Sequence, residues 1–423
     1  MIQRRRMFLA LLGLFGLAAL GAATGLLRSE TAASAARRAA SRFQAPPAAA
    51  ALAPDSIKPG LRLTYYLMTG SLSGSVNGWV PDEEGDWADR QGRRYATERK
   101  GLGSHGLIQA TVVGGDGGVF ALAEPFYLFN GGDTTPIYNT SLDSLVTSDT
   151  GGDFWMHPRR QAQVLRDYPW NGLPLAGRTL ARTTAWRDEA GRTYQATHIV
   201  IIGGASRTSY IYDQAGGYLL YLSRLTSEPP AIRDRTQPLS DSVSYATFLR
   251  FRGARQLNLP WLGKPMAESL RAARTLAYRG QSVLQGQGIV PTPLAITASL
   301  QLQRSGADWL WLHGRTQTQG TFGITEFNSV DGPGSLAPLA IPPAVLAGLA
   351  VGQVIDRDPL TGFAVRVANA DAQYVALQSD GPRQSFTYVY ERARGLLLRK
   401  ITQDRSLATG MITVTDIQLT GVQ

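Results

Sequence analysis

The chain has 423 residues, enough for two or three domains, and 43% of them are hydrophobic, which excludes disorder of the whole chain. Glycine is abundant, at 46 residues, and only 17% of the residues are charged, a composition that favours a turn-rich β protein over a helical one. The formal net charge of +10 does not indicate nucleic-acid binding, because residues 1–42 hold seven arginines and no basic cluster follows them.

Residues 1–27 form a basic and then apolar segment that is typical of an export signal or a membrane anchor. The residues that define the signal are Arg4, Arg5, Arg6, Phe8 and Leu9. Their Arg-Arg-x-Phe-Leu order resembles the bacterial twin-arginine export signal, although an arginine stands where Ser or Thr is usual. Cleavage near Gly21–Ala23 and retention as an anchor both fit, since a helix over residues 7–27 would be about 31 Å long. We favour cleavage.

Both outcomes place the rest of the chain outside the cytoplasm, either periplasmic, secreted or anchored to the outer face of the inner membrane. The membrane is then the partner of the N-terminus. Residues 28–56, rich in Ala, Arg and Pro, are predicted to be a spacer without a packed core.

Two halves of the chain carry the same anchor sequences in the same order, which predicts a duplicated module. The best match pairs Tyr210–Leu220 with Tyr388–Leu398, and both segments contain Tyr-x-Tyr, an acid, a Gly and Leu-Leu. The other matches pair residues 155–158 with 340–343, Gly172 with Gly352, and residues 247–253 with 415–421. The long period and the two copies exclude a solenoid or a propeller.

The matched segment predicts a β-hairpin. Tyr-x-Tyr alternation places both rings on one face of a strand, and Gly217 or Gly395 supplies the positive φ that closes such a turn. Trp186 and Tyr194 flank an Asp-x-x-Gly turn in the same way, so we expect them to form a cross-strand aromatic pair.

Most other segments alternate or form short apolar runs, which predicts a mainly β fold. We expect two homologous antiparallel-sheet modules of the half-barrel or curved-sheet type, at residues 57–254 and 273–423, with a linker at residues 255–272. A few short helices are predicted to begin at Pro158, Pro265 and Pro343, since proline in the first helical turn costs no hydrogen bond. The Tyr-x-Tyr-Asp-x-x-x-Gly-x-Leu-Leu hairpin resembles the half-barrel sheets of bacterial lipoprotein-carrier folds, a likeness in fold that covers one hairpin per module.

No local motif indicates a catalytic or metal site. The chain has no cysteine, which excludes disulfides, thiolate metal sites and cysteine nucleophiles. The four histidines are scattered, and Asp149–Gly151 lacks the preceding apolar residues and the second copy that an aspartic-protease triplet needs. We therefore predict no cofactor, no metal and a non-catalytic protein. Four alternating acids could ligate Ca²⁺, although we expect them to form a solvated loop: Asp82, Glu84, Asp86 and Asp89.

Pairs of aromatic residues are the remaining candidates for a binding site. Residues two apart share one face of a strand, so each pair faces either the core or a groove that it lines with a flat apolar wall. The predicted ligand-binding residues are Tyr210, Tyr212, Tyr388, Tyr390, Trp309 and Trp311.

Three functions fit these observations. The first is a non-catalytic extracytoplasmic binding or carrier protein of the bacterial cell envelope, for an amphiphilic or glycan ligand. The alternatives are a structural or assembly protein of the envelope, and a hydrolase whose carboxylates converge only in the fold. Export, duplication and the lack of catalytic motifs favour the first.

Overall fold

The computed structural model describes residues 57–73, 80–81, 87–88, 105–129, 136–171, 177–188, 190–203, 206–227, 243–320, 324–406 and 410–423. The predicted export segment with its arginines, the spacer and the acidic residues 82–89, apart from β3 (Trp87–Ala88), lie outside these ranges. None of the helices in the described ranges is long and apolar enough to cross a bilayer.

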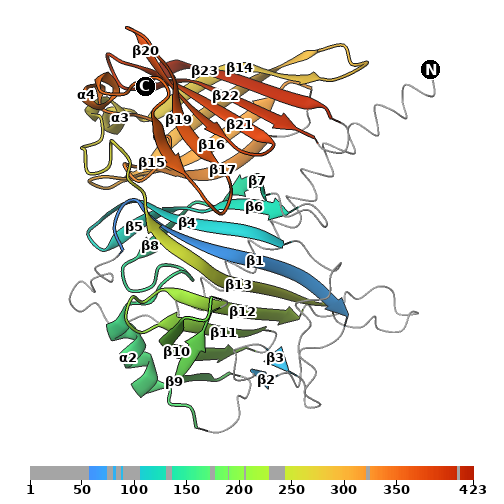
Figure 1. The fold of residues 1–423 in the computed structure, drawn as a ribbon, viewed down its shortest axis with the longest axis vertical. Helices are drawn as coiled ribbons and strands as arrows, with labels where there is room; N and C mark the ends of the chain where they lie inside the picture. Colours follow the sequence, from blue (N-terminus) through green and yellow to red (C-terminus); the bar gives the residue numbers. More distant parts are fainter. Residues whose placement is uncertain are drawn as a thin grey trace. The chain divides into compact units, whose positions relative to one another are not determined.

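The fold is mainly β, as predicted, and consists of two large antiparallel sheets that do not close into barrels (Figure 1). The first sheet has eleven strands in the order β7-β6-β4-β1-β13-β12-β11-β10-β9, with β5 paired to β4 and β8 to β5. Its strands are β1 (Leu61–Ser73), β4 (His105–Asp116), β5 (Val119–Ala123), β6 (Pro125–Phe129), β7 (Pro136–Ser141), β8 (Ser144–Thr147), β9 (Thr179–Arg187), β10 (Thr193–Ile202), β11 (Ser206–Asp213), β12 (Leu219–Ser227) and β13 (Val243–Gln256). β2 (Val80–Pro81) pairs separately with β3.

The second sheet has ten strands in the order β17-β16-β15-β14-β23-β22-β21-β20-β19-β18. Its strands are β14 (Thr275–Gln285), β15 (Pro293–Ser305), β16 (Leu310–Thr318), β17 (Ile324–Asp331), β18 (Val354–Arg357), β19 (Ala364–Ala370), β20 (Tyr374–Asp380), β21 (Gln384–Glu391), β22 (Leu397–Arg405) and β23 (Ile412–Val422). In both sheets the first long strand lies beside the last one, β1 beside β13 and β14 beside β23. This shared topology is what a duplicated module requires.

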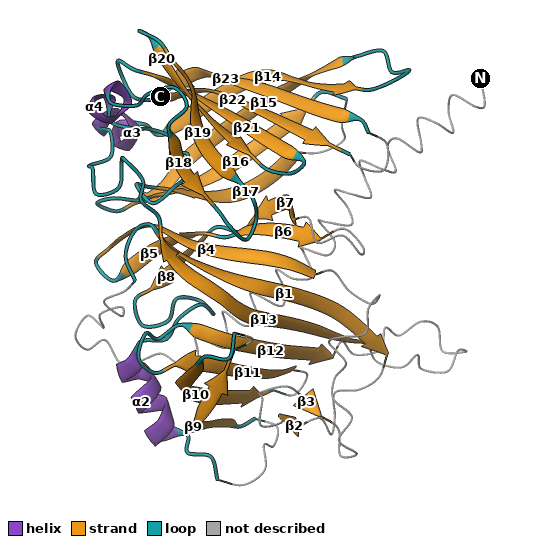
Figure 2. Ribbon diagram, in the orientation of Figure 1, coloured by secondary structure: helices purple, strands orange, loops and turns teal. Residues whose placement is uncertain are grey.

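Three short helices interrupt the strands in the described ranges (Figure 2). α2 (Pro158–Asp167) and α4 (Pro343–Ala347) begin at the predicted prolines. α3 (Glu268–Ala272) begins at Glu268 and not at the predicted Pro265, and it ends early because β14 already begins at Thr275.

The predicted hairpins are confirmed. Trp186 and Tyr194 are directly paired across β9 and β10. In the turns of the duplicated hairpin, Gly217 and Gly395 have φ values of 75° and 72°.

The two copies of the hairpin are equivalent bond for bond. Each has a β-bulge just before its second tyrosine, Tyr212 or Tyr390. The segment before each helix crosses the hairpin through one bridge, which pairs Trp155 with Tyr218 in the first copy and Ala340 with Leu396 in the second.

The match between Gly172 and Gly352 stays a prediction, because Gly172 lies outside the described residues. Gly352 itself donates its N–H to the carbonyl of Val367 on β19.

Candidate functional site

The structure places four of the six predicted binding residues in the core. Tyr210, Tyr212, Tyr390 and Trp309 are buried, and Tyr388 and Trp311 are half-buried. We call the face of each sheet that carries its Tyr-x-Tyr pair the inner face. A binding role for the six residues remains a prediction.

The second tyrosine of each pair has a structural role. The hydroxyl of Tyr212 donates to the carbonyl of Asp153 at 3.3 Å, and that of Tyr390 donates to the carbonyl of Pro338 at 2.8 Å. Each acceptor lies two residues before the bridge to the hairpin, so the two bonds are equivalent. Burial raises the pKa of both phenols, which therefore stay neutral donors.

The tryptophan pair lies where the two sheets meet. Trp309 and Trp311 pack with Val113 and Ala121 of the first sheet. The indole N–H of Trp309 donates to the carboxylate of Asp116 at 3.1 Å. These contacts assign the pair to the joint between the sheets.

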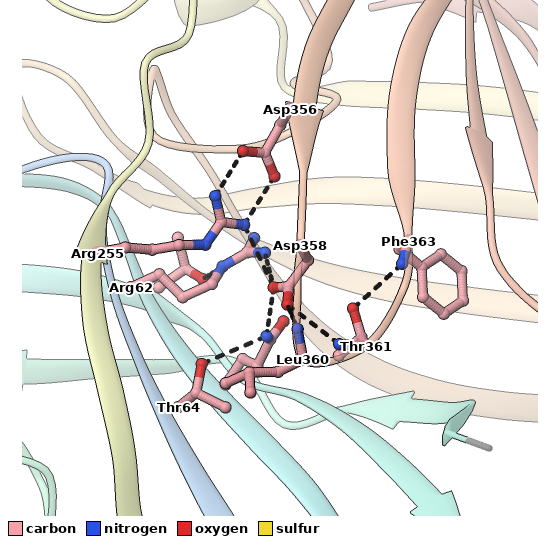
Figure 3. Close-up of polar contacts among 10 residues, drawn as sticks. Arg62, Thr64, Arg255, Asp356, Asp358, Leu360, Thr361 and Phe363 are labelled. Carbon is pink, nitrogen blue, oxygen red and sulfur yellow. Dashed lines mark hydrogen bonds and ion pairs between the residues drawn. The ribbon is translucent and has the colours of Figure 1, made fainter. Parts of the chain in front are cut away.

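A buried ion cluster forms a second part of this joint (Figure 3). Arg255 from the end of β13 makes two hydrogen bonds of 2.6 and 2.8 Å to Asp356, and a third of 3.2 Å to Asp358. Arg62 and Gln109 reach the same Asp358 oxygen at 3.2 and 2.6 Å. The cluster therefore joins β1, β4 and β13 of the first sheet to the end of β18 in the second.

The chemistry of this cluster is that of a structural contact. Burial alone would raise the pKa of Asp358, but the hydrogen bond from Gln109, the charge of Arg62 and the backbone N–H groups of Leu360 and Thr361 hold it below its ordinary value. Asp358 therefore stays ionised, and both acids are held by arginines in a contact that joins the two sheets.

The inner face of the first sheet is filled. The indole of Trp155 is completely buried and packs with Tyr65 and Tyr212 in the core of this face. Arg224, which also lies here, is neutralised by Asp153 at 3.1 Å and accompanied by the Tyr210 hydroxyl at 3.2 Å. In the described part of this face the aromatic side chains are packed and Arg224 is paired with a carboxylate.

The inner face of the second sheet has the same framework with different side chains. Pairing register defines one line of directly adjacent residues across each sheet, which we call the central row. In the first sheet the central row is Leu67, Leu249, Leu222, Tyr210 and Ile199, all buried. In the second sheet it is Gly280, Ile417, Lys400, Tyr388 and Leu377.

The second central row is more open than the first. Ile417, Lys400 and Tyr388 are half-buried, and so are the neighbouring inner-face residues Phe386 and Thr402. One difference in size accompanies this opening, because Ala340 occupies the bridge position of Trp155. Gly280 takes the position of Leu67, but there the backbone of β23 fills the place of the missing side chain.

The glycine at position 280 allows β14 and β23 to lie close together. A Cβ atom there would lie 1.8 Å from the carbonyl oxygen of Asp416 on β23, so only glycine allows this approach of the two strands.

Lys400 is the least expected residue of the central row. Its Nζ lies 5.8 Å from the centre of the Tyr388 ring, a cation–π contact. Among the described residues it has no hydrogen bond and no ion pair. Asp404, on the same face of β22, is four residues away, or about 13 Å along the strand.

The environment of Lys400 indicates a concave surface. Burial lowers the pKa of its ammonium group, and no carboxylate raises it. The side chain nevertheless keeps partial contact with solvent. A side chain that is surrounded by protein and still reaches water lies in a hollow of the surface.

Aromatic rings connect this position to the first sheet. The ring centre of Tyr138 from β7 lies 5.6 Å from that of Phe386, and the ring centre of Phe386 lies 6.5 Å from that of Tyr388. Tyr127 from β6 lies 6.0 Å from Tyr138 and 5.5 Å from Phe363. A strand pair of the first sheet thus forms part of the wall around the second inner face.

The phenols of this wall have unused hydrogen-bonding groups. Within the described residues the hydroxyls of Tyr127, Tyr138 and Tyr388 have no hydrogen-bond partner. Burial raises the pKa of Tyr127 to about 12, and it raises the pKa values of Tyr138 and Tyr388 as well. All three are therefore neutral donors at physiological pH.

Two hollows lie away from the second inner face. One, of about 10 Å³, is lined by leucines between α3 and the strands β14–β16. The other, of about 350 Å³, lies beside the end of α2 with Asp167 and Arg178 in its lining. None of the six predicted aromatics lines either, so a ligand on the second inner face would occupy an open surface.

Two of the four histidines make structural contacts. His157 caps α2 by accepting from the N–H of Arg159 at 3.0 Å. His198 is fully buried and lies 2.8 Å from the hydroxyl of Ser209, and burial together with nearby Arg182 lowers its pKa to about 3. Among the described residues, no three His, Asp or Glu side chains are grouped as metal ligands.

Comparisons with known proteins give no family. No family model matches the chain, and no curated protein matches it. A protein of unknown function from the DUF3598 family of Nostoc punctiforme is 10% identical, with 84% of this chain and 95% of that chain covered, at a TM-score of 0.15. A putative outer membrane protein from Bacteroides fragilis is 9% identical, with coverages of 85% and 97% and a TM-score of 0.13.

Transferrin-binding protein B from Haemophilus parasuis is 8% identical, with 86% of this chain and 79% of that chain covered, at a TM-score of 0.15. TM-scores this low carry no argument about what this chain does. The function has to be argued from its own residues.

Proposed function

We propose that the protein is a non-catalytic, extracytoplasmic binding or carrier protein for an amphiphilic ligand, and that the inner face of the second sheet is its binding surface. The observation that carries the proposal is the unpaired Lys400 on a half-exposed, aromatic and concave face. The basic and apolar segment at residues 1–27 supports a location outside the cytoplasm.

Apolar contact surface beside a few free polar groups is the usual composition of a site for amphiphiles. Ile417 and Phe386 supply the apolar part, and Lys400 and the phenols supply the polar part. The filled inner face of the first sheet has neither and supports a purely structural role for that copy.

Recovery of a ligand with the protein tests the proposal. We expect solvent extracts of the full chain, purified without detergent after export, to contain an amphiphile in near-stoichiometric amount by mass spectrometry. The stripped protein should then bind N-phenyl-1-naphthylamine, a neutral probe that fluoresces in apolar surroundings, and the extracted amphiphile should displace it.

A matched pair of variants locates the binding surface. Thr402→Phe fills the second inner face beside Phe386, whereas Thr387→Phe adds the same ring to the opposite face of the neighbouring strand β21. We expect the first variant to weaken probe binding about tenfold and the second to leave it unchanged. A stripped protein that binds no probe, together with extracts free of amphiphile, would overturn the proposed function.

A further inference from the structure

We infer that the ligand of the second inner face is a single-chain amphiphile with one anionic head group, a long-chain carboxylate, whose head lies at Lys400 and the hydroxyls of Tyr388 and Tyr138. This inference rests on the proposed function, because it names the ligand class for the same surface. It is carried by the charge of the site, which no carboxylate of the described residues compensates.

The two cations on the two inner faces differ in whether a carboxylate neutralises them. Arg224 on the first inner face is paired with Asp153 at 3.1 Å, so a ligand anion there would have to compete with a carboxylate. Lys400 contacts only the face of the Tyr388 ring and has no ion pair within the described residues. A charge held in poorly solvated surroundings without a partner is costly, and an anionic ligand removes that cost.

The neighbouring donors favour the same ligand. Phenol hydroxyls that stay protonated donate to an oxyanion, and those of Tyr138 and Tyr388 have no protein acceptor in the described part of the chain. The one acid of β22, Asp404, lies about 13 Å away along the strand and points to the end of the face, where it would repel an anion placed beside it. These charges fix one end of the face as the place for the head group.

Half-buried apolar residues beside Lys400 suit an alkyl chain. Ile417 is the direct neighbour of Lys400 across the sheet, and Phe386 lies on the same face, with its ring centre 6.5 Å from that of Tyr388. One ammonium group matches one negative charge, so a head with a single carboxylate is the simplest complement.

Head-group selectivity tests the inference. cis-Parinaric acid, a fluorescent straight-chain carboxylic acid, and its methyl ester share one chain and differ only in the charge of the head. We expect the full, stripped protein to bind the acid about tenfold more tightly than the ester at pH 7.5. Lys400→Met should abolish this preference and Lys400→Arg should keep it.

A neighbouring cation supplies the control. Arg399 is adjacent to Lys400 but faces the opposite side of the sheet, where it pairs with Asp416 at 2.6 Å, so Arg399→Gln removes the same charge and should leave the preference intact. Inorganic phosphate at millimolar concentration should not displace the acid, because the alkyl chain contributes most of the affinity.

The outcomes separate the two proposals. Equal binding of acid and ester, or a preference that survives in Lys400→Met, overturns the anionic head group while the binding function stands. Failure of both probes and of the neutral naphthylamine to bind overturns the binding function itself.

Discussion

The two inner faces are built on one framework and differ in what fills it. Both carry the bulged hairpin, the turn glycine and a tyrosine that donates to the carbonyl two residues before the bridge. The first face is closed by Trp155 and by a neutralised arginine, whereas the second has Ala340 at the bridge and an unpaired Lys400 in its central row. The difference teaches that the repeated residues hold the hairpin and that the unrepeated ones decide whether a face is core or surface.

The strongest test of this contrast removes a charge from the filled face. Asp153→Ala would leave Arg224, whose side chain is only 9% exposed, without its counter-ion, and we expect a loss of about 3 kcal/mol in the free energy of unfolding. Asp416→Ala, which breaks the more exposed pair with Arg399, should cost no more than about 1 kcal/mol. Urea denaturation followed by fluorescence measures both, and equal costs would contradict the account of the first face.

Removal of the charge on the open face should increase the free energy of unfolding. Lys400→Met deletes a cation that no carboxylate compensates, so we expect unfolding to become harder by about 1 kcal/mol. Arg399→Met, on the outer side of the same strand, should be neutral or slightly destabilising. A clear loss of stability in Lys400→Met would mean that Lys400 has a partner that stabilises the fold.

Equal effects are expected where the copies are equivalent. Tyr212→Phe and Tyr390→Phe each delete one hydroxyl that donates to a buried carbonyl, and each should cost about 1 kcal/mol. Unequal losses, one near zero and the other near 3 kcal/mol, would show that the two hairpins do not serve the same role.

The gain from Lys400→Met should also depend on pH. Because burial lowers the pKa of Lys400 in the folded protein below its ordinary value of 10.5, the unfolded chain binds more protons in the window between the two values. Wild-type stability therefore rises with pH through that window, and the advantage of the variant is full below the folded-state pKa and gone above about pH 10.5. Tyr388, whose ring faces Lys400, has a raised pKa and does not titrate earlier.

Local features of the fold were accessible from the sequence. Tyr-x-Tyr alternation and the turn glycines predicted both hairpins, and the prolines at positions 158 and 343 predicted the starts of two helices. These features depend on residues close together in the chain. The order of the repeated segments also predicted two related antiparallel sheets, because equal sequences fold alike.

Long-range features were not accessible. Arg62 and Asp358 are 296 positions apart, and nothing in their local sequence indicates that they meet. The tryptophans at positions 309 and 311 looked like a ligand wall, although they pack at the joint between the sheets, because the sequence does not show which face a neighbouring sheet covers.

One signal for the site is present in the sequence. The matched hairpins align Lys400 with Leu222, so a lysine occupies a position that is core in the other copy. A charge at an apolar position of a repeat marks a place where the copies have diverged in role. Tyr138 has no such signal, since it reaches the second face from another sheet.

Photo-crosslinking compares the two faces most directly. A long-chain fatty acid with a diazirine in its alkyl chain, irradiated with the stripped protein and mapped by peptide mass spectrometry, should label β21, β22 and β23 around Tyr388 and Ile417, and should lose that labelling in Thr402→Phe. The equivalent strands β11, β12 and β13 should remain unlabelled. Labelling of the first inner face, or equal labelling of both, would contradict the claim that one copy is filled and the other open.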